Sequence, residues 1–385
     1  MTNQTHPRFS PGKSEGLAGP ASGSVGFGYV SSHRHVTEKY LSDAFDPECT
    51  THFDLDLFKP NVSLFSLLNS AQNRGEAAEV YVHLLDNPAL PHDLQNSPIQ
   101  TAGMDIDSFS WTNSRIRWSM LFDYVFVWHL SMVPLYEAAG HPKVIPMPHA
   151  VDGDLCVNAN PEEDRALDLG WVGAFKHSQY ARRKRIIKPL AAKFAMNDVE
   201  QYYSKQETAA VYRQSKIVVN VSRDEFPSEA NMRCYEAMGS GALLITQIPT
   251  ELTDWSFREG EHFVAWRHEA EIPELVERYL ADPKRRMEIA RAGQELTLRR
   301  FTFQHCRSRM LEVFQGNQNE FFAPARKWSV EDVSLVYLEY YYRYQLFSAA
   351  FDEFSILRNA SRRGYWKGLP MILKMTRNSL KRALL

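Results

Sequence analysis

The sequence has few of the features that mark a secreted, metal-binding or nucleic-acid-binding protein. Its 385 residues contain four cysteines, none of them in a Cys-x-x-Cys pair. A zinc ribbon or a redox dithiol is therefore not indicated, and isolated thiols favour a reducing cytoplasm over a disulfide-linked secreted scaffold. The formal net charge is −2, which gives no general attraction to nucleic acid.

Long apolar runs are also lacking. Residues 1–24 are polar and rich in Gly, Pro and Ser, without the apolar stretch of a signal peptide, so we expect a flexible leader. No run of about 18 apolar residues occurs, and no transmembrane helix is expected. The hydrophobic content of 44% is typical of a globular protein, and the length suffices for two domains and an extension.

The sequence does contain an alternation of strand and helix patterns. Short β-branched or aromatic runs that end at Gly, Pro or Asn predict strands, and three-to-four-residue apolar spacing predicts helices. The predicted strands lie within 25–30, 79–85, 98–107, 123–128, 143–152, 167–175, 217–222, 242–246 and 262–266. The pattern predicts an α/β fold with two Rossmann-like domains facing a cleft, 25–152 and 153–314, followed by a helical extension over 315–385.

The stretch FPSEANMRCYEAMGSGALLIT, residues 226–246, carries the first candidate site. Arg233 and Glu236 share one face of a predicted helix that begins at the carboxyl end of a strand, where helix N-termini bind anions. An arginine there can pair with phosphate, and a glutamate can accept hydrogen bonds from a ribose diol. On spacing alone, a surface ion pair with Gly239 as the helix cap explains the same residues.

Several segments in the same order resemble the C-terminal domain of the CgeB-like glycosyltransferases, which are of the group-one type and have the GT-B fold. They are LGWVGAFKHSQYARRKRII, NMRCYEAMGSGALLIT, the Leu252-x-Asp254 pair, EGEHFVAW, ADPKRRMEIARAGQE and FTFQHCRSRML. The resemblance covers about residues 75–312. It implies a nucleotide-sugar donor as co-substrate, bound mainly to the C-terminal domain, with no metal and no other cofactor. It also implies retention of anomeric configuration.

The resemblance assigns roles to residues around the glycine turn. Glu236 resembles the second glutamate of a Glu-x7-Glu motif, which in relatives holds the nucleotide ribose. The first glutamate falls at Ser228, with Glu229 one step away. CgeB-like members often carry Asn-x-Arg instead, as Asn231 and Arg233 do here.

Other residues are assigned by their place in the same domain. Gly173 resembles the glycine at which the backbone approaches the diphosphate. Arg183, or its neighbour Arg182 or Lys184, resembles the basic residue that neutralises the diphosphate, and counting does not separate the three. With Arg233 it is expected to stabilise the leaving group. Tyr203 lies where relatives hold the base, although a core aromatic explains it too.

One histidine is the candidate in the N-terminal domain. His83 follows the strand EVYV and precedes a Pro-rich loop. In GT-B relatives a histidine in the N-domain cleft often contacts the donor sugar, and the resemblance makes His83 a catalytic candidate. A histidine that only caps the loop is the alternative.

Two other functions stay open. Asp105-x-Asp107, like Asp54-x-Asp56, is a D-x-D pattern that binds a divalent cation in a different, metal-dependent class of transferase. Ser228 at the first-glutamate position also leaves open a non-catalytic protein that binds a sugar nucleotide or a glycan.

The C-terminal region predicts a docked helix and a basic helix. VYLEYYYRYQLF, residues 336–347, is too aromatic to stay free and is expected to pack on the body. In GLPMILKMTRNSLKRALL, residues Leu369, Ile372, Leu373, Leu380 and Leu384 can form one stripe, with Lys374, Arg377 and Lys381 on another face. Such a helix binds an anionic membrane surface peripherally, or it packs on the body or on a partner.

Overall fold

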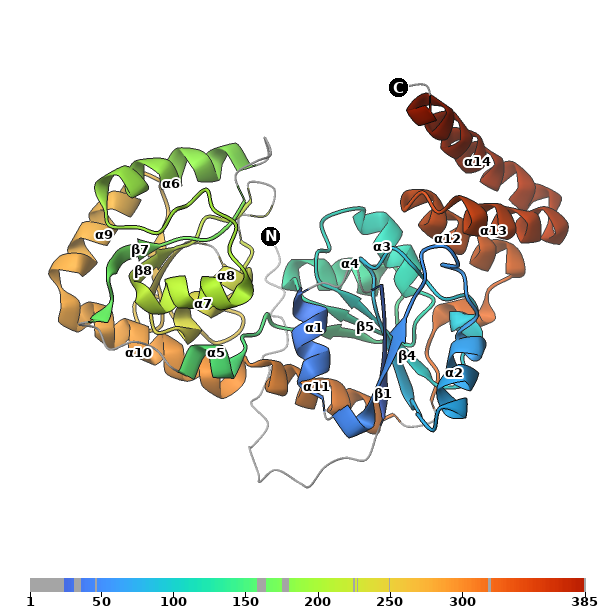
Figure 1. The fold of residues 1–385 in the computed structure, drawn as a ribbon, viewed down its shortest axis with the longest axis horizontal. Coiled ribbons are helices and arrows are strands. Elements are labelled where there is room, and N and C mark those ends of the chain that lie inside the picture. The colour runs from blue at the N-terminus through green and yellow to red at the C-terminus, as the bar shows by residue number, and fades with distance from the viewer. Residues whose placement is uncertain are drawn as a thin grey trace.

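The computed structural model has two α/β domains, with a helical extension on one of them (Figure 1). The described residues are 24–30, 36–45, 47–157, 164–174, 180–223, 226, 228–248, 250–317 and 320–383. The predicted leader lies outside them apart from Ser24.

The first domain is built on a six-stranded sheet in the order β2-β1-β3-β4-β5-β6. Its strands are β1 (Val25–Tyr29), β2 (Thr50–Asp54), β3 (Val80–Leu84), β4 (Gln100–Asp105), β5 (Tyr124–Val127) and β6 (Val144–Pro146). All neighbouring pairs are parallel, so every carboxyl end lies at one edge. The sequence patterns predicted all of these strands except β2, an edge strand whose side chains alternate between buried and exposed.

Short helices connect these strands. They are α1 (Val36–Asp43), α2 (Leu64–Asn73), α3 (Thr112–Ser119) and α4 (Val133–Ala138), with 3-10 turns η2 (Pro47–Cys49), η3 (Leu94–Asn96) and η4 (Leu130–Met132). Helix α1 lies between β1 and β2 in the chain, and α2 lies between β2 and β3.

The second domain has a four-stranded parallel sheet in the order β10-β9-β8-β7. Its strands are β7 (Leu167–Gly170), β8 (Ser215–Val219), β9 (Leu243–Gln247) and β10 (Val264–Trp266). Its helices are α5 (Gly153–Val157), α6 (Ala181–Lys193), α7 (Lys205–Gln214), α8 (Met232–Gly239), α9 (Glu271–Ala281) and α10 (Pro283–Arg300).

Local chemistry sets the limits of these helices. A capping box starts α7, because the Ser204 hydroxyl accepts from the Glu207 amide and the Glu207 carboxylate accepts from the Ser204 amide. Between α9 and α10, the Asp282 carboxylate accepts from the Arg285 amide at 3.0 Å and Pro283 opens α10.

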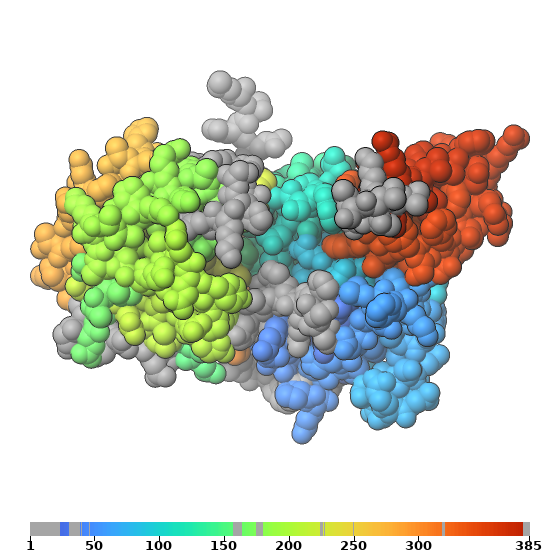
Figure 2. All heavy atoms as spheres, turned by 45° about the horizontal axis from the view of Figure 1, so that its top comes forward, coloured from blue at the N-terminus to red at the C-terminus, as the bar shows by residue number. Residues whose placement is uncertain are grey.

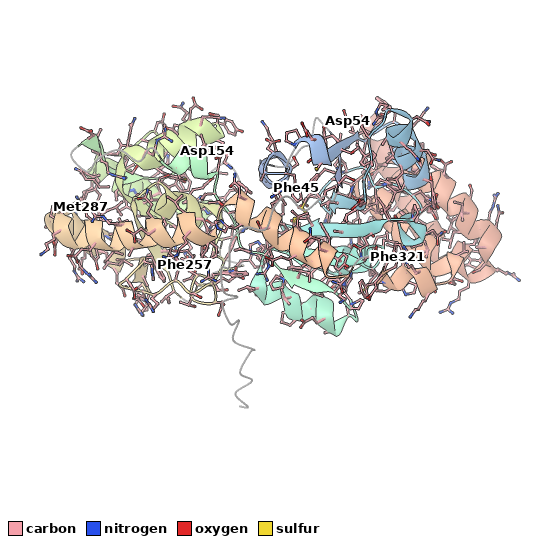
Figure 3. The ribbon with its side chains drawn as sticks, turned by 90° about the horizontal axis from the view of Figure 1, so that it is seen from below. Phe45, Asp54, Asp154, Phe257, Met287 and Phe321 are labelled. Carbon is pink, nitrogen blue, oxygen red and sulfur yellow. The ribbon has the colours of Figure 1, made fainter. Side chains whose placement is uncertain are left out.

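The chain returns to the first domain after α10. The Val151 amide donates to the Phe301 carbonyl at 2.9 Å, and the Phe303 amide donates to the Val151 carbonyl at 3.1 Å, so the two crossing segments are bonded together. Helix α11 (Phe303–Gln315) follows, and Figure 3 shows it continuing the line of α10 across the molecule. Its residues Phe303, Met310 and Phe314 pack against one face of the first sheet. Helix α11, which we had grouped with the second domain, therefore packs on the first.

The extension covers the opposite face of the first sheet. It consists of α12 (Val330–Arg343), α13 (Phe347–Ala360) and α14 (Arg362–Ala383), preceded by the 3-10 turn η7 (Pro324–Lys327). Figure 2 shows it seated beside the first domain. The aromatic segment docks as predicted: the hydroxyls of Tyr340, Tyr341 and Tyr344 donate to carbonyls of Asn87, Leu90 and Leu85.

Helix α14 uses a different face for packing than its sequence predicted. Gly364, Gly368, Ile372 and Met375 are buried. A side chain at Gly368 would lie 2.7 Å from Leu357 and 2.9 Å from Leu338, so glycine permits this close approach of helices. The expected apolar stripe is therefore split, because Ile372 points inward while Leu373 is exposed; the side chains of residues 380–385 lie outside the described part.

Candidate functional site

The carboxyl ends of both sheets meet at the joint between the domains. His129 follows β5 in the first domain, and Glu229 and Glu251 follow β8 and β9 in the second. The His129 ring nitrogens lie 3.9 Å from the Glu229 carboxylate and 3.7 Å from the Glu251 carboxylate. Ligands of parallel α/β sheets bind at this edge, so the candidate site lies here.

Arg233 occupies the centre of the second-sheet edge. It lies in the first turn of α8 and donates to the Val172 carbonyl at 3.0 and 2.8 Å and to the Asn220 side-chain oxygen at 2.7 Å. Both acceptors are neutral, and no ion pair joins Arg233 to Glu236, although both belong to the described residues. The surface-pair interpretation of these two residues therefore does not describe this site.

Gly173 leaves the space that Arg233 fills. A Cβ at this position would lie 2.6 Å from the Arg233 guanidinium and 2.8 Å from the Trp171 ring. The Arg233 guanidinium also lies 5.1 Å from the centre of that ring. Gly173 and Arg233, which the resemblance assigned to the same diphosphate, are thus in contact.

Arg183 is the member of the basic triplet that reaches this edge. It donates to the Val221 carbonyl, just beyond β8, at 3.0 Å. Arg182 instead pairs with Glu269 at 2.7 Å, and Lys184 is exposed. Burial and the nearby Arg233 lower the pKa of Arg183 to about 10, so it stays cationic at neutral pH.

The N-terminus of α8 adds polar groups. Asn231 is the N-cap residue. Its side-chain nitrogen donates to the Asn220 side-chain oxygen at 3.2 Å, and its side-chain oxygen is buried without a hydrogen bond. The first amides of a helix are free to bind an anion. Arg183, Arg233 and this helix start together form a cationic edge without a carboxylate bonded to either arginine among the described residues.

Glu236 lies on the side of α8 that faces α5 and α7. It lines a small cavity with Asp152, Cys156 and Lys205. Burial raises the pKa of Glu236, while the charges of Lys205 and Arg233 oppose this shift. Burial in turn lowers the pKa of Lys205 to about 8. Glu236, for which the resemblance implies ribose binding, and Lys205 therefore line the same small cavity.

Two candidates lie elsewhere. His83 is fully buried within β3, where its ring stacks on Phe122 and Nδ1 lies 3.1 Å from the Tyr81 hydroxyl. Burial lowers the pKa of His83 to about 3. The Tyr203 hydroxyl donates to the Asp198 carbonyl at 2.9 Å, and its ring packs on the second-domain core. Neither residue is in contact with the cationic edge in this structure.

His129, which the sequence analysis did not select, does occupy the joint, and the centre of the His149 ring lies 5.5 Å from that of His129. A usable signal was present, because His129 directly follows the predicted strand DYVFVW and therefore belongs at the carboxyl edge. His83 lies inside its strand. Glu251 and Arg223 at the joint were likewise not selected, and their loops carry no pattern that marks them.

The D-x-D carboxylates do not point to one place. Asp105 is fully buried, accepts from Arg115 at 3.0 Å through one oxygen and from the Tyr136 hydroxyl through the other, while Asp107 is exposed. Asp54 and Asp56 are exposed at the far edge of the sheet. Within the described ranges, no group of three or more His, Cys, Asp or Glu residues is arranged to hold a metal ion.

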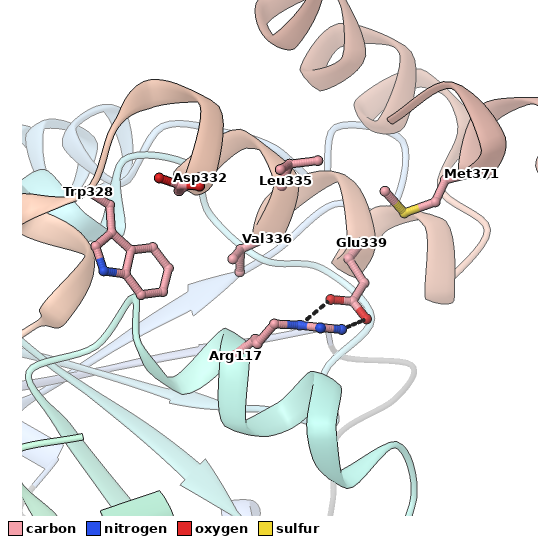
Figure 4. Close-up of a pocket in the computed structure, with 7 residues that line it drawn as sticks. All are labelled: Arg117, Trp328, Asp332, Leu335, Val336, Glu339 and Met371. Carbon is pink, nitrogen blue, oxygen red and sulfur yellow. Dashed lines mark hydrogen bonds and ion pairs between the residues drawn. The ribbon is translucent and has the colours of Figure 1, made fainter. Parts of the chain in front are cut away.

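A further cavity lies away from the joint, between α3, α12 and α14 (Figure 4). It measures about 570 Å³ and is lined by Arg117, Trp328, Asp332, Leu335, Val336, Glu339 and Met371. The Arg117–Glu339 ion pair crosses its floor. Its position shows that the extension forms a hollow of its own, separate from the cationic edge.

Comparison with known proteins agrees with this geometry. Residues 172–312 match the model of a glycosyl transferase-like family. This segment contains Gly173, Arg183, Arg233 and Glu236, and the match confirms the predicted enzyme class, a glycosyltransferase. No curated protein matches the sequence.

Solved structures identify the fold. HepE from Anabaena, in complex with UDP, superposes with a TM-score of 0.56 at 11% identity and covers 76% of this chain and 100% of HepE. A glycosyltransferase from Rickettsia africae gives a TM-score of 0.51 at 8% identity, over 77% of this chain and 99% of that one. The predicted GT-B fold is confirmed.

Proposed function

We propose that this protein transfers a sugar from a UDP-sugar to an acceptor, with the donor in the second domain and the acceptor in the first. The observation that carries the proposal is the cationic edge formed by Arg183, Arg233 and the start of α8, inside the segment that matches the glycosyltransferase model. HepE structures with UDP and with UDP-glucose support uridine as the base. The Asn231-x-Arg233 pair supports a place in the CgeB-like subgroup.

Each part of the donor has a matching group. The two arginines offer N–H groups to the diphosphate, and the helix start adds backbone amides. Gly173 lets the backbone approach the same charge. Glu236 accepts hydrogen bonds from the ribose hydroxyls and positions the nucleotide; it is not the base. Glu229, with one buried carboxylate oxygen that has no hydrogen bond, takes the sugar-facing place next to His129.

A thermal-shift series tests donor binding. The protein is melted with UDP and with UDP-, GDP-, ADP-, CMP- and dTDP-linked sugars, all at one concentration; a ligand present at about a hundred times its dissociation constant adds roughly 2.7 kcal/mol to the unfolding free energy. We expect UDP-glucose and UDP to raise the melting temperature most. Absence of a shift with every nucleotide contradicts the proposal.

Charge stabilisation by the arginines leaves no required role for a metal, and the protein needs no other cofactor in this proposal. Metal-independent transfer is supported by Asp105 of the D-x-D pattern, because Arg115 and Tyr136 already donate hydrogen bonds to its two oxygens. We expect turnover of UDP-glucose to persist in EDTA. Full loss in EDTA with recovery on adding Mn²⁺ favours the metal-dependent alternative instead.

The proposed reaction retains anomeric configuration. The bond between the anomeric carbon and the diphosphate oxygen breaks, the acceptor oxygen bonds to the same face, and the acceptor proton passes to a diphosphate oxygen. Arg183 and Arg233 stabilise the charge that develops on the departing diphosphate. NMR of the product, read at the anomeric proton, tests this step, and an inverted product excludes it.

A non-catalytic binding protein is the second candidate, favoured by Ser228 at the first-glutamate position. Slow hydrolysis of UDP-glucose without acceptor separates the two. Hydrolysis that disappears in Arg183→Ala identifies an enzyme, whereas tight UDP binding without hydrolysis or transfer identifies the binding protein.

The outer face of α14 supports a peripheral contact with the inner, anionic face of a cytoplasmic membrane. Trp366 and Leu373 are exposed by 61% and 60% and lie seven residues apart on one face, with exposed Lys374 and Arg377 beside them. Apolar and basic groups together bind anionic lipid surfaces. Among the described helices, none is long and apolar enough to cross a membrane.

Sedimentation with liposomes tests this contact. We expect binding to phosphatidylserine-containing vesicles that weakens with salt, because the surface field falls off within about a Debye length. Leu373→Ser with Lys374→Glu should abolish it, and the exposed Lys184→Glu in the second domain is the matched charge control. A full-length protein that ignores these vesicles contradicts the contact.

A further inference from the structure

The loop after β4 places a large aromatic ring at the surface in a strained conformation. Trp111 has φ 58° and ψ 37° and is 42% exposed. Bulky residues rarely adopt this left-handed region, because it is strained for them. Trp111 also occupies the N-cap of α3, where Ser, Thr, Asp or Asn is preferred. Neither stability nor solubility favours a tryptophan at this position.

The ring is held rigidly. Trp118 meets it edge-on at 6.2 Å between ring centres, and Tyr344, from the end of α12, does so at 5.5 Å. The Arg343 guanidinium lies 5.6 Å from the Trp111 ring centre. Two residues from the C-terminal extension therefore help to fix an indole whose remaining surface is open to solvent.

Arg115 joins this loop to two carboxylates, Asp105 at the end of β4 and Asp86 just after β3. Its side chain donates to the Ser110 carbonyl, next to Trp111, at 2.6 Å and to Asp105 at 3.0 Å, and it also pairs with Asp86 after β3. One Asp86 oxygen makes that pair, while the other has no hydrogen bond. The Tyr344 hydroxyl donates to the Leu85 carbonyl at 3.2 Å, which brings the ring and Asp86 to the same corner.

This corner adjoins the joint between the domains. Phe109 of the same loop stacks on Phe226 of the second domain and lies 4.4 Å from the His129 ring, centre to centre. Trp111 is two positions beyond Phe109, a chain distance of about 7 Å at most. Exposed Asp107 interacts electrostatically with both Asp86 and Glu229. The indole and the carboxylate therefore lie beside the place where the donor sugar is expected.

We propose that Trp111 and Asp86 form the acceptor subsite and that the acceptor is a neutral carbohydrate, whose ring stacks on the indole and whose hydroxyl donates to Asp86. The inference rests on the proposed glycosyl transfer. A sugar ring presents a face of C–H groups that packs on an aromatic surface and an edge of hydroxyls that bond to a carboxylate, and this corner offers both.

The charges nearby favour a neutral acceptor over a charged one. Asp105 and Asp86 outnumber Arg115, Asp107 adds an exposed negative charge, and Arg343 beside the indole lies 3.9 Å from the Glu339 carboxylate. An anionic acceptor would meet like charge here, and a cation would find its main carboxylate partner already paired with arginine. A ligand with hydroxyl donors and no net charge is compatible with this balance.

The test uses UDP-saturated full-length protein and trisaccharides built from glucose, N-acetylglucosamine, mannose or galactose. Binding is measured by saturation-transfer NMR and calorimetry. We expect at least one to bind, Trp111→Ala and Asp86→Asn each to weaken that binding about tenfold or more, and Trp111→Phe to keep most of it. Trp111→Gly, which accepts a φ of 58° without strain, guards against misfolding.

Trp366→Ala is the control, since it removes another exposed tryptophan, from α14. UDP affinity is measured in every variant and is expected to stay unchanged, so failure of this subsite is distinguishable from failure of donor binding. The proposal is overturned if none of the trisaccharides binds, or if both Trp111→Ala and Trp111→Gly bind the sugar as the unaltered protein does.

Discussion

Each domain buries one arginine at the carboxyl edge of its sheet, and the two arginines are treated in opposite ways. Arg115 in the first domain is 1% exposed and pairs with both Asp86 and Asp105. Arg233 in the second domain is 9% exposed and bonds to the neutral oxygens of Val172 and Asn220, with Arg183 near it.

The contrast indicates that Arg115 stabilises the fold, whereas Arg233 is positioned to bind a ligand. The buried Arg115 guanidinium is paired with carboxylates of the protein itself, and its removal leaves these carboxylates without a compensating charge. Among the described residues no carboxylate is hydrogen-bonded to Arg183 or Arg233, although Glu229 and Glu236 lie near them; this pair of cations attracts an anion and stabilises the fold little until one binds. Mutation should therefore affect stability at the first edge and nucleotide affinity at the second.

The largest effect is expected for Arg115→Ala. Asp105, fully buried, loses its ion partner, and we expect a loss of about 3–5 kcal/mol in the unfolding free energy, measured by urea denaturation. Arg117→Ala is the matched control on the same helix, because Arg117 is exposed and its ion pair should be worth about 1 kcal/mol or less. Equal losses in the two variants would show that Arg115 is not a structural charge.

Arg183→Ala should leave the melting temperature nearly unchanged and weaken UDP binding. Loss of a charged hydrogen bond costs about 1.5–3 kcal/mol, or roughly 10- to 150-fold in affinity, measured by calorimetry. Lys184→Ala removes an adjacent exposed cation and should have little effect. If both variants lose affinity alike, only the general positive charge of α6 matters.

Glu236→Ala should have a smaller effect, about 1.5 kcal/mol, because ribose hydroxyls are neutral and stay partly solvated. The comparison ligand is pyrophosphate, which has no ribose. We expect Glu236→Ala to weaken UDP but not pyrophosphate, whereas Arg183→Ala weakens both. Unchanged UDP affinity in Glu236→Ala removes the ribose assignment.

The smallest effect concerns the joint between the two edges. Burial acts to lower the pKa of His129, but Glu251 and Glu229 outweigh it and the pKa is raised. The stabilisation is thus fully present below the unfolded-state pKa of about 6.5 and is lost as pH rises through the folded-state value. His129→Gln should flatten the fall in melting temperature over that range. A variant with the same pH profile as the unaltered protein contradicts this role.

The sequence predicted the two sheets because parallel strands are buried on both faces and read as short apolar runs between helical patterns. It did not separate Arg182, Arg183 and Lys184, because each residue of a helix turns by about 100° and only packing decides which one faces the strand ends. The structure orients Arg182 toward Glu269 and Arg183 toward Val221.

The choice of histidine depended on an element far along the chain. His83 and Tyr81 point to the same face of β3, since side chains alternate along a strand. That face is covered by the extension, with Tyr337 and Tyr341 among the residues of the same core. Nothing near His83 in the sequence reveals that cover, whereas the position of His129 just beyond its strand was a local clue.

The paired crossing segments also make the second domain a removable module. The chain enters it beyond Val151 and leaves it at Phe301, and these two points are hydrogen-bonded neighbours. A segment whose two ends are neighbours can be removed or replaced without changing the path of the rest of the chain. Residues 152–301 are thus suited to expression by themselves, and to exchange with the corresponding segment of another GT-B protein. Such a chimera would pair a new donor preference with the acceptor corner at Trp111.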